Sequence, residues 1–206
     1  MTVRDIGAML DSALTMESHI KSVKKSCYHQ IRNISKIRKY LSEDAAKTLV
    51  NAFVTSRLDN MNALLYNLPN SQIEKLQMIQ NNSARVIKKC KKSDHITPHL
   101  FDLHWLPINY RIKYKILLIV YKCLHGEGPE YIASLLEQYQ PPRALRSASQ
   151  HRLRELRAQK KYGERAFSRA GPKLWNELPF DIKCSKSKDI FKKALKTYFF
   201  KTAYNL

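Results

Sequence analysis

Apolar residues recur at three- and four-residue spacing over most of this chain, the pattern of amphipathic helices. The first such stretch runs from about residue 17 to residue 41, and its other face is rich in lysine and arginine. Its apolar positions are Ile20, Val23, Cys27, Ile34, Ile37 and Leu41, with Gln30 interrupting the series. The residues before it alternate between apolar and polar around Gly7, so we expect an extended or turn-rich lead-in there.

Two further helices are predicted before residue 92. One starts after Ser42, a residue typical of helix N-caps, and is expected to end at Pro69. The next starts at Ser71, where Glu74 stands at the spacing of a capping box, and ends in the run Lys88-Lys89-Cys90-Lys91-Lys92. Because the connections are short, residues 17–92 are predicted to close a three-helix bundle.

The rest of the chain is predicted to form a smaller helical domain with a basic arm. Residues 93–138 carry helix starts at Pro98, Pro107 and Pro129 and a glycine stop at Gly126. Residues 139–165 have weak periodicity and many arginines, which indicates a mobile arm or long loop. Residues 166–206 regain helical periodicity, so the expected fold class is all-α.

The net charge of the chain indicates which kinds of partner it could bind. The chain holds 37 Lys+Arg against 17 Asp+Glu, a formal net charge of +20, and such an excess favours a polyanionic partner. Nucleic acid is the first candidate, an anionic membrane surface the second, and a merely soluble basic protein the alternative.

No signal peptide precedes the first helix, and the longest apolar run, Ile116 to Tyr121, is too short to cross a bilayer. We therefore expect a protein of the nucleus or cytoplasm that is not secreted and has no membrane partner. The widely spaced cysteines are expected to be free thiols: Cys27, Cys90, Cys123 and Cys184.

No residues suggest catalysis. The adjacent acids Glu43 and Asp44 fall in the first turn of a predicted helix, where negative charge interacts favourably with the positive end of the helix dipole. The sequence contains no phosphate-binding loop. A weak metal pattern, loosely like a zinc knuckle, is formed by Cys90, His95, His99 and His104. The surrounding lysines oppose a metal ion, so no metal, cofactor or small-molecule substrate is expected. The aromatic residues Trp105, Tyr110, Tyr114 and Tyr121 could stack on bases but are expected to lie in the core.

The basic clusters are therefore the candidate binding residues. On the first helix they would form a ridge about 25 Å long, suited to phosphate contacts that do not read sequence. The candidates on this helix are Lys21, Lys24, Lys25, Arg32, Lys36 and Lys39. Those in the later clusters are Lys88, Lys89, Lys91, Lys92, Arg143, Arg146, Arg152, Arg154, Lys160 and Lys161.

Two Trp-Pro motifs give the chain a family resemblance. His104-Trp105-Leu106-Pro107 and the run from Gly171 to Pro179 (Gly-Pro-Lys-Leu-Trp-Asn-Glu-Leu-Pro) resemble the C-terminal region of reverse transcriptases of non-LTR retrotransposons, both the jockey-like and the chicken-repeat-like elements. Shorter matches follow in the same order along nearly the whole chain, among them Leu64 to Pro69, Lys75 to Arg85 and Tyr121 to Gly126.

The resemblance implies a thumb and a post-thumb domain without the catalytic palm, whose aspartates would lie upstream of Met1. Residues 1–16 would be the end of the palm, and the thumb would grip a primer–template duplex of RNA and DNA. The chain would have no catalytic activity of its own, and its partners would be RNA or DNA or the missing palm supplied in trans. The alternatives are a protein-interaction module, an inert remnant of a decayed element and, more distantly, a basic amphipathic membrane helix at 187–203.

Overall fold

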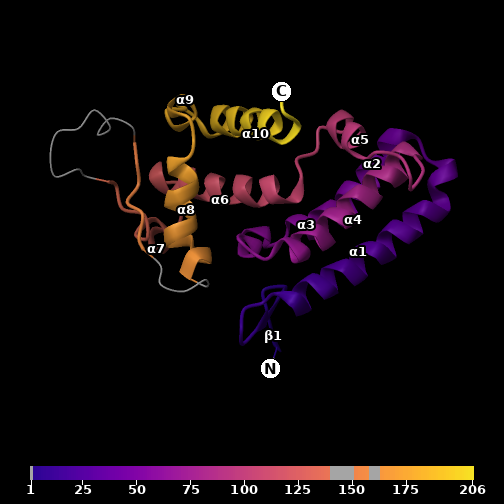
Figure 1. Cartoon of the computed structure of the whole chain (residues 1–206), viewed down its shortest axis with the longest axis horizontal. Coiled ribbons are helices and arrows are strands. Elements are labelled where there is room, and N and C mark those ends of the chain that lie inside the picture. The colour runs from indigo at the N-terminus through magenta and orange to yellow at the C-terminus, as the bar shows by residue number, and fades with distance from the viewer. Residues whose placement is uncertain (1, 140–150, 158–162) are drawn as a thin grey trace. The chain divides into compact units, whose positions relative to one another are not determined.

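The computed structural model describes residues 2–139, 151–157 and 163–206, and the chain divides into two compact units between Arg111 and Ile112. The described residues are mostly helical, which confirms the all-α class that the periodicity predicted. Figure 1 shows the helices of each unit.

The chain begins with a two-stranded antiparallel hairpin, β1 (Thr2–Asp5) and β2 (Ala8–Asp11), in the segment expected to be extended. Ile6 and Gly7 both have positive φ, 43° and 91°, as a two-residue hairpin turn requires. The carboxylate of Asp11 then accepts hydrogen bonds from the backbone N–H groups of Thr15 (2.8 Å) and Met16 (2.9 Å). This carboxylate satisfies two donors of the chain just before the first helix.

Helix α1 (Glu17–Ile37) buries one side, as predicted, but the buried residues differ in part from the expected stripe, and His19 is also buried. Ile31, next to the Gln30 that interrupts the predicted pattern, is buried with Ile34, whereas Ile37 is 46% exposed. Ile37 is not buried because α1 ends there and a 3-10 turn, η1 (Arg38–Tyr40), changes the direction of the chain.

The predicted helix from Ser42 to Pro69 begins as expected but ends earlier. Ser42 caps α2 (Glu43–Val50) by accepting from the N–H of Ala45 at 3.1 Å. A π-helical segment, η2 (Asn51–Thr55), leads into α3 (Ser56–Asp59), and the chain then turns through η3 (Asn62–Leu65), a 3-10 turn. Asn60 is already extended and Met61 is left-handed, so the helix ends about ten residues before the proline that was expected to end it.

Helix α4 (Asn70–Lys88) also starts differently from the prediction. Pro69 occupies the N-cap position and no side chain caps the helix, so the capping box predicted at Ser71 is wrong. Lys89, with φ 54°, ends the helix in the left-handed conformation.

Helices α1 and α4 run side by side in the same direction (Figure 1). Near their starts the amide of Gln72 donates to the Glu17 carboxylate at 3.0 Å, and midway the amide of Asn82 donates to the Tyr28 hydroxyl at 3.0 Å. At their ends the Arg38 guanidinium reaches the last carbonyls of α4. With α2 packed against both, these helices form the core of the first unit.

The first unit is completed by α5 (Thr97–Asp102) and the segment that carries the first Trp-Pro motif. Trp105 is 7% exposed and Leu106 is 5% exposed, so both belong to the core, as expected for Trp105. The amide of the buried Gln80 donates to the Leu106 carbonyl oxygen at 2.9 Å and fixes this segment against α4.

The second unit is built mainly on α6 (Ile108–Leu124), α8 (Phe167–Asn176) and α10 (Lys188–Tyr204), with shorter helices α7 (Glu130–Ala133) and α9 (Phe180–Lys183). Its core is aromatic. The rings of Tyr121 and Phe191 stack with centroids 4.3 Å apart, and Trp175 lies 5.9 Å from Phe191. Trp175 is 2% exposed, which confirms its expected role in packing.

In the segment predicted as a mobile arm or long loop, the described residues 151–157 form no helix and are exposed apart from Leu153. Residues 151–157 run against the chain near Gln138, with Leu153 buried at 3% exposure. The Asn176 side chain accepts from the Leu153 N–H and donates to the Leu153 carbonyl oxygen, both at 2.9 Å. Asn176 thus pairs with Leu153 as a neighbouring strand would, and this pairing anchors the segment at Leu153. Most of the rest of the predicted arm lies outside the described residues, namely residues 140–150 and 158–162.

Candidate nucleic-acid interface

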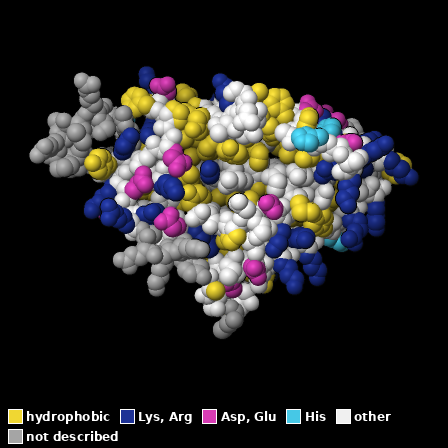
Figure 2. Space-filling view, viewed as in Figure 1, with side chains coloured by type: hydrophobic (Ala, Val, Ile, Leu, Met, Phe, Trp, Pro, Cys, Tyr) yellow, Lys and Arg dark blue, Asp and Glu magenta, His cyan; other side chains and the backbone are white. Residues whose placement is uncertain are grey.

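The basic residues of α1 are exposed and most of them share one face. At 3.6 residues per turn, the spacing of Lys21, Lys25, Arg32 and Lys36 places them on the same side of the helix, away from the buried stripe. We call these residues the α1 stripe. Among the described residues no carboxylate lies within ion-pair distance of them. Figure 2 shows Lys and Arg side chains following α1 across the first unit.

Lys24 and Lys39 have different surroundings. Lys24 is exposed but lies roughly 60° around the helix from Lys21, toward the buried side, so it borders the stripe. Lys39 is also exposed and places its ammonium 4.7 Å from the centre of the Tyr40 ring, a cation–π contact.

The tertiary structure brings a second predicted cluster to the end of the α1 stripe. Arg38 is nearly buried and donates to the carbonyl oxygens of Val86 at 2.8 Å and Ile87 at 2.6 Å. The ends of α1 and α4 therefore meet. Three exposed lysines that follow α4 lie at the same end of the unit as Lys36 and Lys39: Lys89, Lys91 and Lys92.

Lys88 differs from the other lysines of its cluster. Its side chain is 16% exposed, and its ammonium pairs with Glu43 at 2.5 Å and with Asp102. Hydrogen bonds to Asp102 and then Glu43 raise the pKa of Lys88, and the bond to Lys88 lowers the pKa of Asp102. Lys88 links α4 to α2 and α5, so its charge is already neutralised within the fold.

The remaining predicted residues lie in or near the basic segment of the second unit. Arg152 and Arg154 are exposed, and Arg154 forms a surface ion pair with Glu137 at 2.8 Å. The other four lie outside the described residues: Arg143, Arg146, Lys160 and Lys161.

The sequence did not predict a cavity that lies within the second unit. Its volume is about 450 Å³, and its walls come from the end of α6, the packed segment around Leu153, α8 and the chain that follows α9. Lys183 lines it and is 7% exposed, although lysine side chains are rarely buried. No local signal in the sequence separates Lys183 from the many exposed lysines, because only the packing of α9 buries it.

The thiols differ in their surroundings. Cys27 and Cys123 are buried, Cys90 is intermediate and Cys184 is exposed; all are free. Burial raises the pKa of Cys27 to about 11. Within the described residues, no group of His, Cys, Asp or Glu is arranged to hold a metal ion. No helix of that part of the chain is long and apolar enough to cross a membrane.

Comparison with protein-family models, with curated proteins and with solved structures finds no match to this chain.

Proposed function

We propose that this chain binds the sugar–phosphate backbone of RNA or DNA without reading sequence, and that it performs no catalysis by itself. The observation that carries the proposal is the α1 stripe. Several exposed cations lie on one face of a long helix without carboxylate partners among the described residues. A row of fixed positive charges matches the repeating charge of a nucleic-acid strand.

The end of α4 extends this surface. Lys89, Lys91 and Lys92 are exposed where α1 ends, so a strand that follows the stripe meets further cations there. The formal net charge of +20 supports the same partner, because a polyanion would relieve the repulsion among these groups.

The resemblance to non-LTR reverse transcriptases gives the proposal its finer form. In that form residues 17–92 are a thumb that would hold a primer–template duplex, residues 93–206 belong to the post-thumb domain, and the catalytic part of the palm lies outside these residues. The parallel α1 and α4 with a third packed helix support a compact thumb-like bundle.

The test is binding across a salt series to an RNA–DNA hybrid, single-stranded RNA and duplex DNA. If the surface neutralises about five phosphates, the log–log salt slope on a single strand is near −3.5. Replacing Lys21, Lys25, Arg32 and Lys36 with Gln removes four charges, so the slope should become shallower by roughly 3 and binding should weaken. All three nucleic acids should be affected, because backbone contacts do not depend on base sequence.

A matched control removes the same charge elsewhere. Lys173, Lys193, Lys196 and Lys201 are exposed on α8 and α10, and their replacement with Gln leaves the α1 stripe intact. This control variant should retain most of the affinity for nucleic acid and most of the salt slope. Equal losses in the two variants would mean that net charge alone attracts the strand, and would contradict a defined interface on α1.

A second candidate function rests on the hairpin. Val3 is 54%, Ile6 83% and Leu14 46% exposed, so apolar side chains face solvent in the segment that would join the palm. Exposed apolar groups of this kind favour a protein interface, with the palm of a related polymerase as the partner.

This second function is tested by titrating a purified palm domain of a non-LTR reverse transcriptase with the chain and with Ile6→Asp. Micromolar binding that the substitution abolishes would support it. No binding by the unaltered chain at high protein concentration would reject the palm as partner.

A further inference from the structure

The cavity of the second unit holds a buried cation. The Lys183 side chain lines the cavity, and its ammonium donates to the carbonyl oxygen of Asn176 at 3.2 Å. An ammonium group has three N–H donors, and a neutral carbonyl does not balance its charge. A buried charge is costly unless an opposite charge compensates it.

The chain itself does not supply that opposite charge. No Asp or Glu of the described residues lies within ion-pair distance of Lys183. Residues 140–150 and 158–162 contain no Asp or Glu at all, so they hold no acidic side chain that could pair with it. Burial, and then the nearby charge of Arg152, lower the pKa of Lys183, as expected for a cation among other cations.

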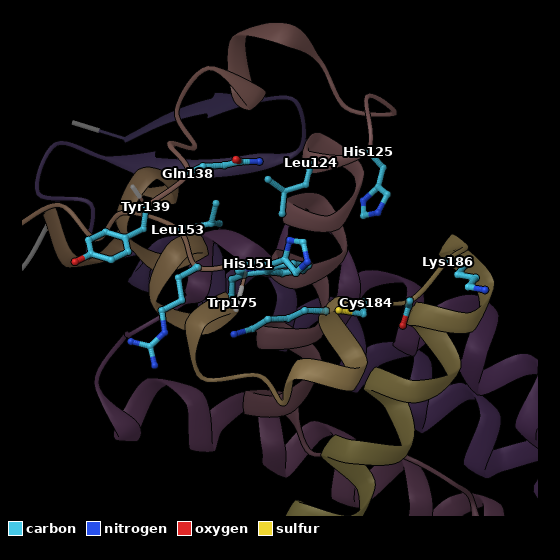
Figure 3. A pocket seen from close by; sticks show the side chains of 12 residues that line it. Leu124, His125, Gln138, Tyr139, His151, Leu153, Trp175, Cys184 and Lys186 are labelled. Carbon is cyan, nitrogen blue, oxygen red and sulfur yellow. The ribbon is translucent and has the colours of Figure 1, made fainter. Parts of the chain in front are cut away.

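The rest of the lining is basic and aromatic. Arg152 and Lys186 add positively charged groups, and Tyr139 and His151 add ring surface; Trp175 also lines the cavity but is only 2% exposed. Figure 3 shows His151 and Trp175 near the middle of the cavity, with Tyr139 and Lys186 toward opposite ends. The Trp175 indole donates to the His151 carbonyl oxygen at 2.8 Å, and the His151 ring stacks at 6.0 Å on Phe180. The His151 backbone is therefore held by the buried Trp175, and its ring lies on the half-exposed Phe180.

We propose that this cavity binds a nucleoside monophosphate group, with the phosphate on Lys183 and the flat base against the aromatic and histidine side chains. Several cations around one cavity suit a phosphate better than a carboxylate, because a phosphate monoester carries more charge and more acceptor oxygens. The volume of about 450 Å³ falls in the usual range of small-ligand pockets. The group comes either from a free nucleotide or from the 5′ end of a strand, and the two sources share this chemistry.

The experiment uses the full chain and measures binding of AMP and of a short oligonucleotide with either a 5′-phosphate or a 5′-hydroxyl end. We expect the 5′-phosphate to strengthen strand binding on the order of tenfold, because a charged hydrogen-bonded pair forms only with it. Binding of AMP itself would show that free nucleotides are also ligands. A preference confined to the strand would assign the cavity to strand ends.

Lys183→Met removes the charge and keeps the side-chain size, so the fold should survive. The variant should lose the preference for the 5′-phosphate, whereas Lys173→Met, at an exposed site on α8, should keep it. A second measurement is alkylation of Cys184, which lines the cavity and is exposed: the phosphorylated ligand should slow it in the unaltered chain but not in Lys183→Met.

Equal affinity for the two strand ends together with no binding of AMP would overturn the proposal. So would a Lys183→Met protein that is folded and binds like the unaltered chain. These outcomes are independent of the strand-binding surface, because the α1 stripe variant reduces binding to both strand ends alike.

Discussion

Among the individual residues, Arg38 shows that a basic side chain of this chain can stabilise the fold through hydrogen bonds instead of being free to bind a ligand. Its guanidinium donates to the carbonyl oxygens of Leu41 (2.7 Å), Val86 (2.8 Å) and Ile87 (2.6 Å). The last carbonyls of a helix have no partner within the helix, so Arg38 satisfies groups at the end of α4 from another helix. Nothing in the local sequence separates it from Lys36 and Lys39.

Arg38→Met should therefore destabilise the first unit by about 3 kcal/mol, because it leaves nearly buried carbonyl groups without donors. Urea unfolding followed by circular dichroism measures the loss. The control, Lys36→Met on the exposed stripe, should change stability by less than about 0.5 kcal/mol. Similar small effects for both variants would contradict a structural role for Arg38.

The thiols give a second residue-scale prediction. Burial raises the pKa of Cys27 to about 11, and Cys27 is buried against the Val54 carbonyl oxygen at 3.9 Å. The thiolate is the reactive form, so Cys27 should resist iodoacetamide near pH 8 while the exposed Cys184 reacts. Mass spectrometry of the alkylated peptides at successive times measures whether Cys184 is alkylated before Cys27. Alkylation of Cys27 as fast as Cys184 in folded protein would show that α1 and the π segment do not enclose it.

At the element scale, periodicity predicted which helices exist but not where they end. The helix after Ser42 continues through a π-helical segment, which exposes Phe53 (45%) and buries Val54. The chain then leaves the helix at Asn60, well before Pro69. Apolar spacing continues beyond that point because η3 also packs inward, so spacing alone could not locate the break.

The ion pairs of Lys88 join α4 to α2 and α5, so we expect the stability of the first unit to depend on pH. The bond to Lys88 lowers the pKa of Asp102, so the contribution of this pair is present above the ordinary carboxylate pKa and is lost as pH falls through the lower, folded value. The stability difference between the unaltered chain and Lys88→Met should therefore be largest near pH 7 and shrink below about pH 4.

Thermal unfolding of both proteins from about pH 7 to about pH 3 measures this difference. Lys89→Met, at the exposed left-handed residue next along the chain, serves as the control because Lys89 forms no ion pair with any described residue. A difference that stays constant as the pH falls would show that Lys88 stabilises the fold through packing rather than charge.

At the scale of the whole molecule, charge is the dominant property. With a net charge of +20, repulsion among exposed cations opposes the compact state, and salt screens it. The midpoint of thermal unfolding should therefore rise by several degrees when NaCl increases from about 50 mM to about 500 mM. A midpoint that falls with salt would mean that ion pairs such as those of Lys88 outweigh the repulsion.

The helical class, the buried faces of most helices and the placement of both tryptophans in the core can be predicted from the amino-acid sequence. These depend on local spacing, on N-cap residues such as Ser42 and on the size of Trp105 and Trp175. It also named the exposed cations of the α1 stripe, because a charged face opposite an apolar one follows from the same periodicity.

Which charged residues remain at the surface cannot be predicted from the sequence, because it depends on how the helices pack. Arg38, Lys88 and Lys183 look like any other basic residue in the sequence, yet the fold uses the first to cap carbonyls, pairs the second with two acids and buries the third beside a cavity. Each of these roles depends on residues or elements brought together from elsewhere in the chain. The physical reason is that the cost of a charge depends on its burial and its partners, and packing sets both.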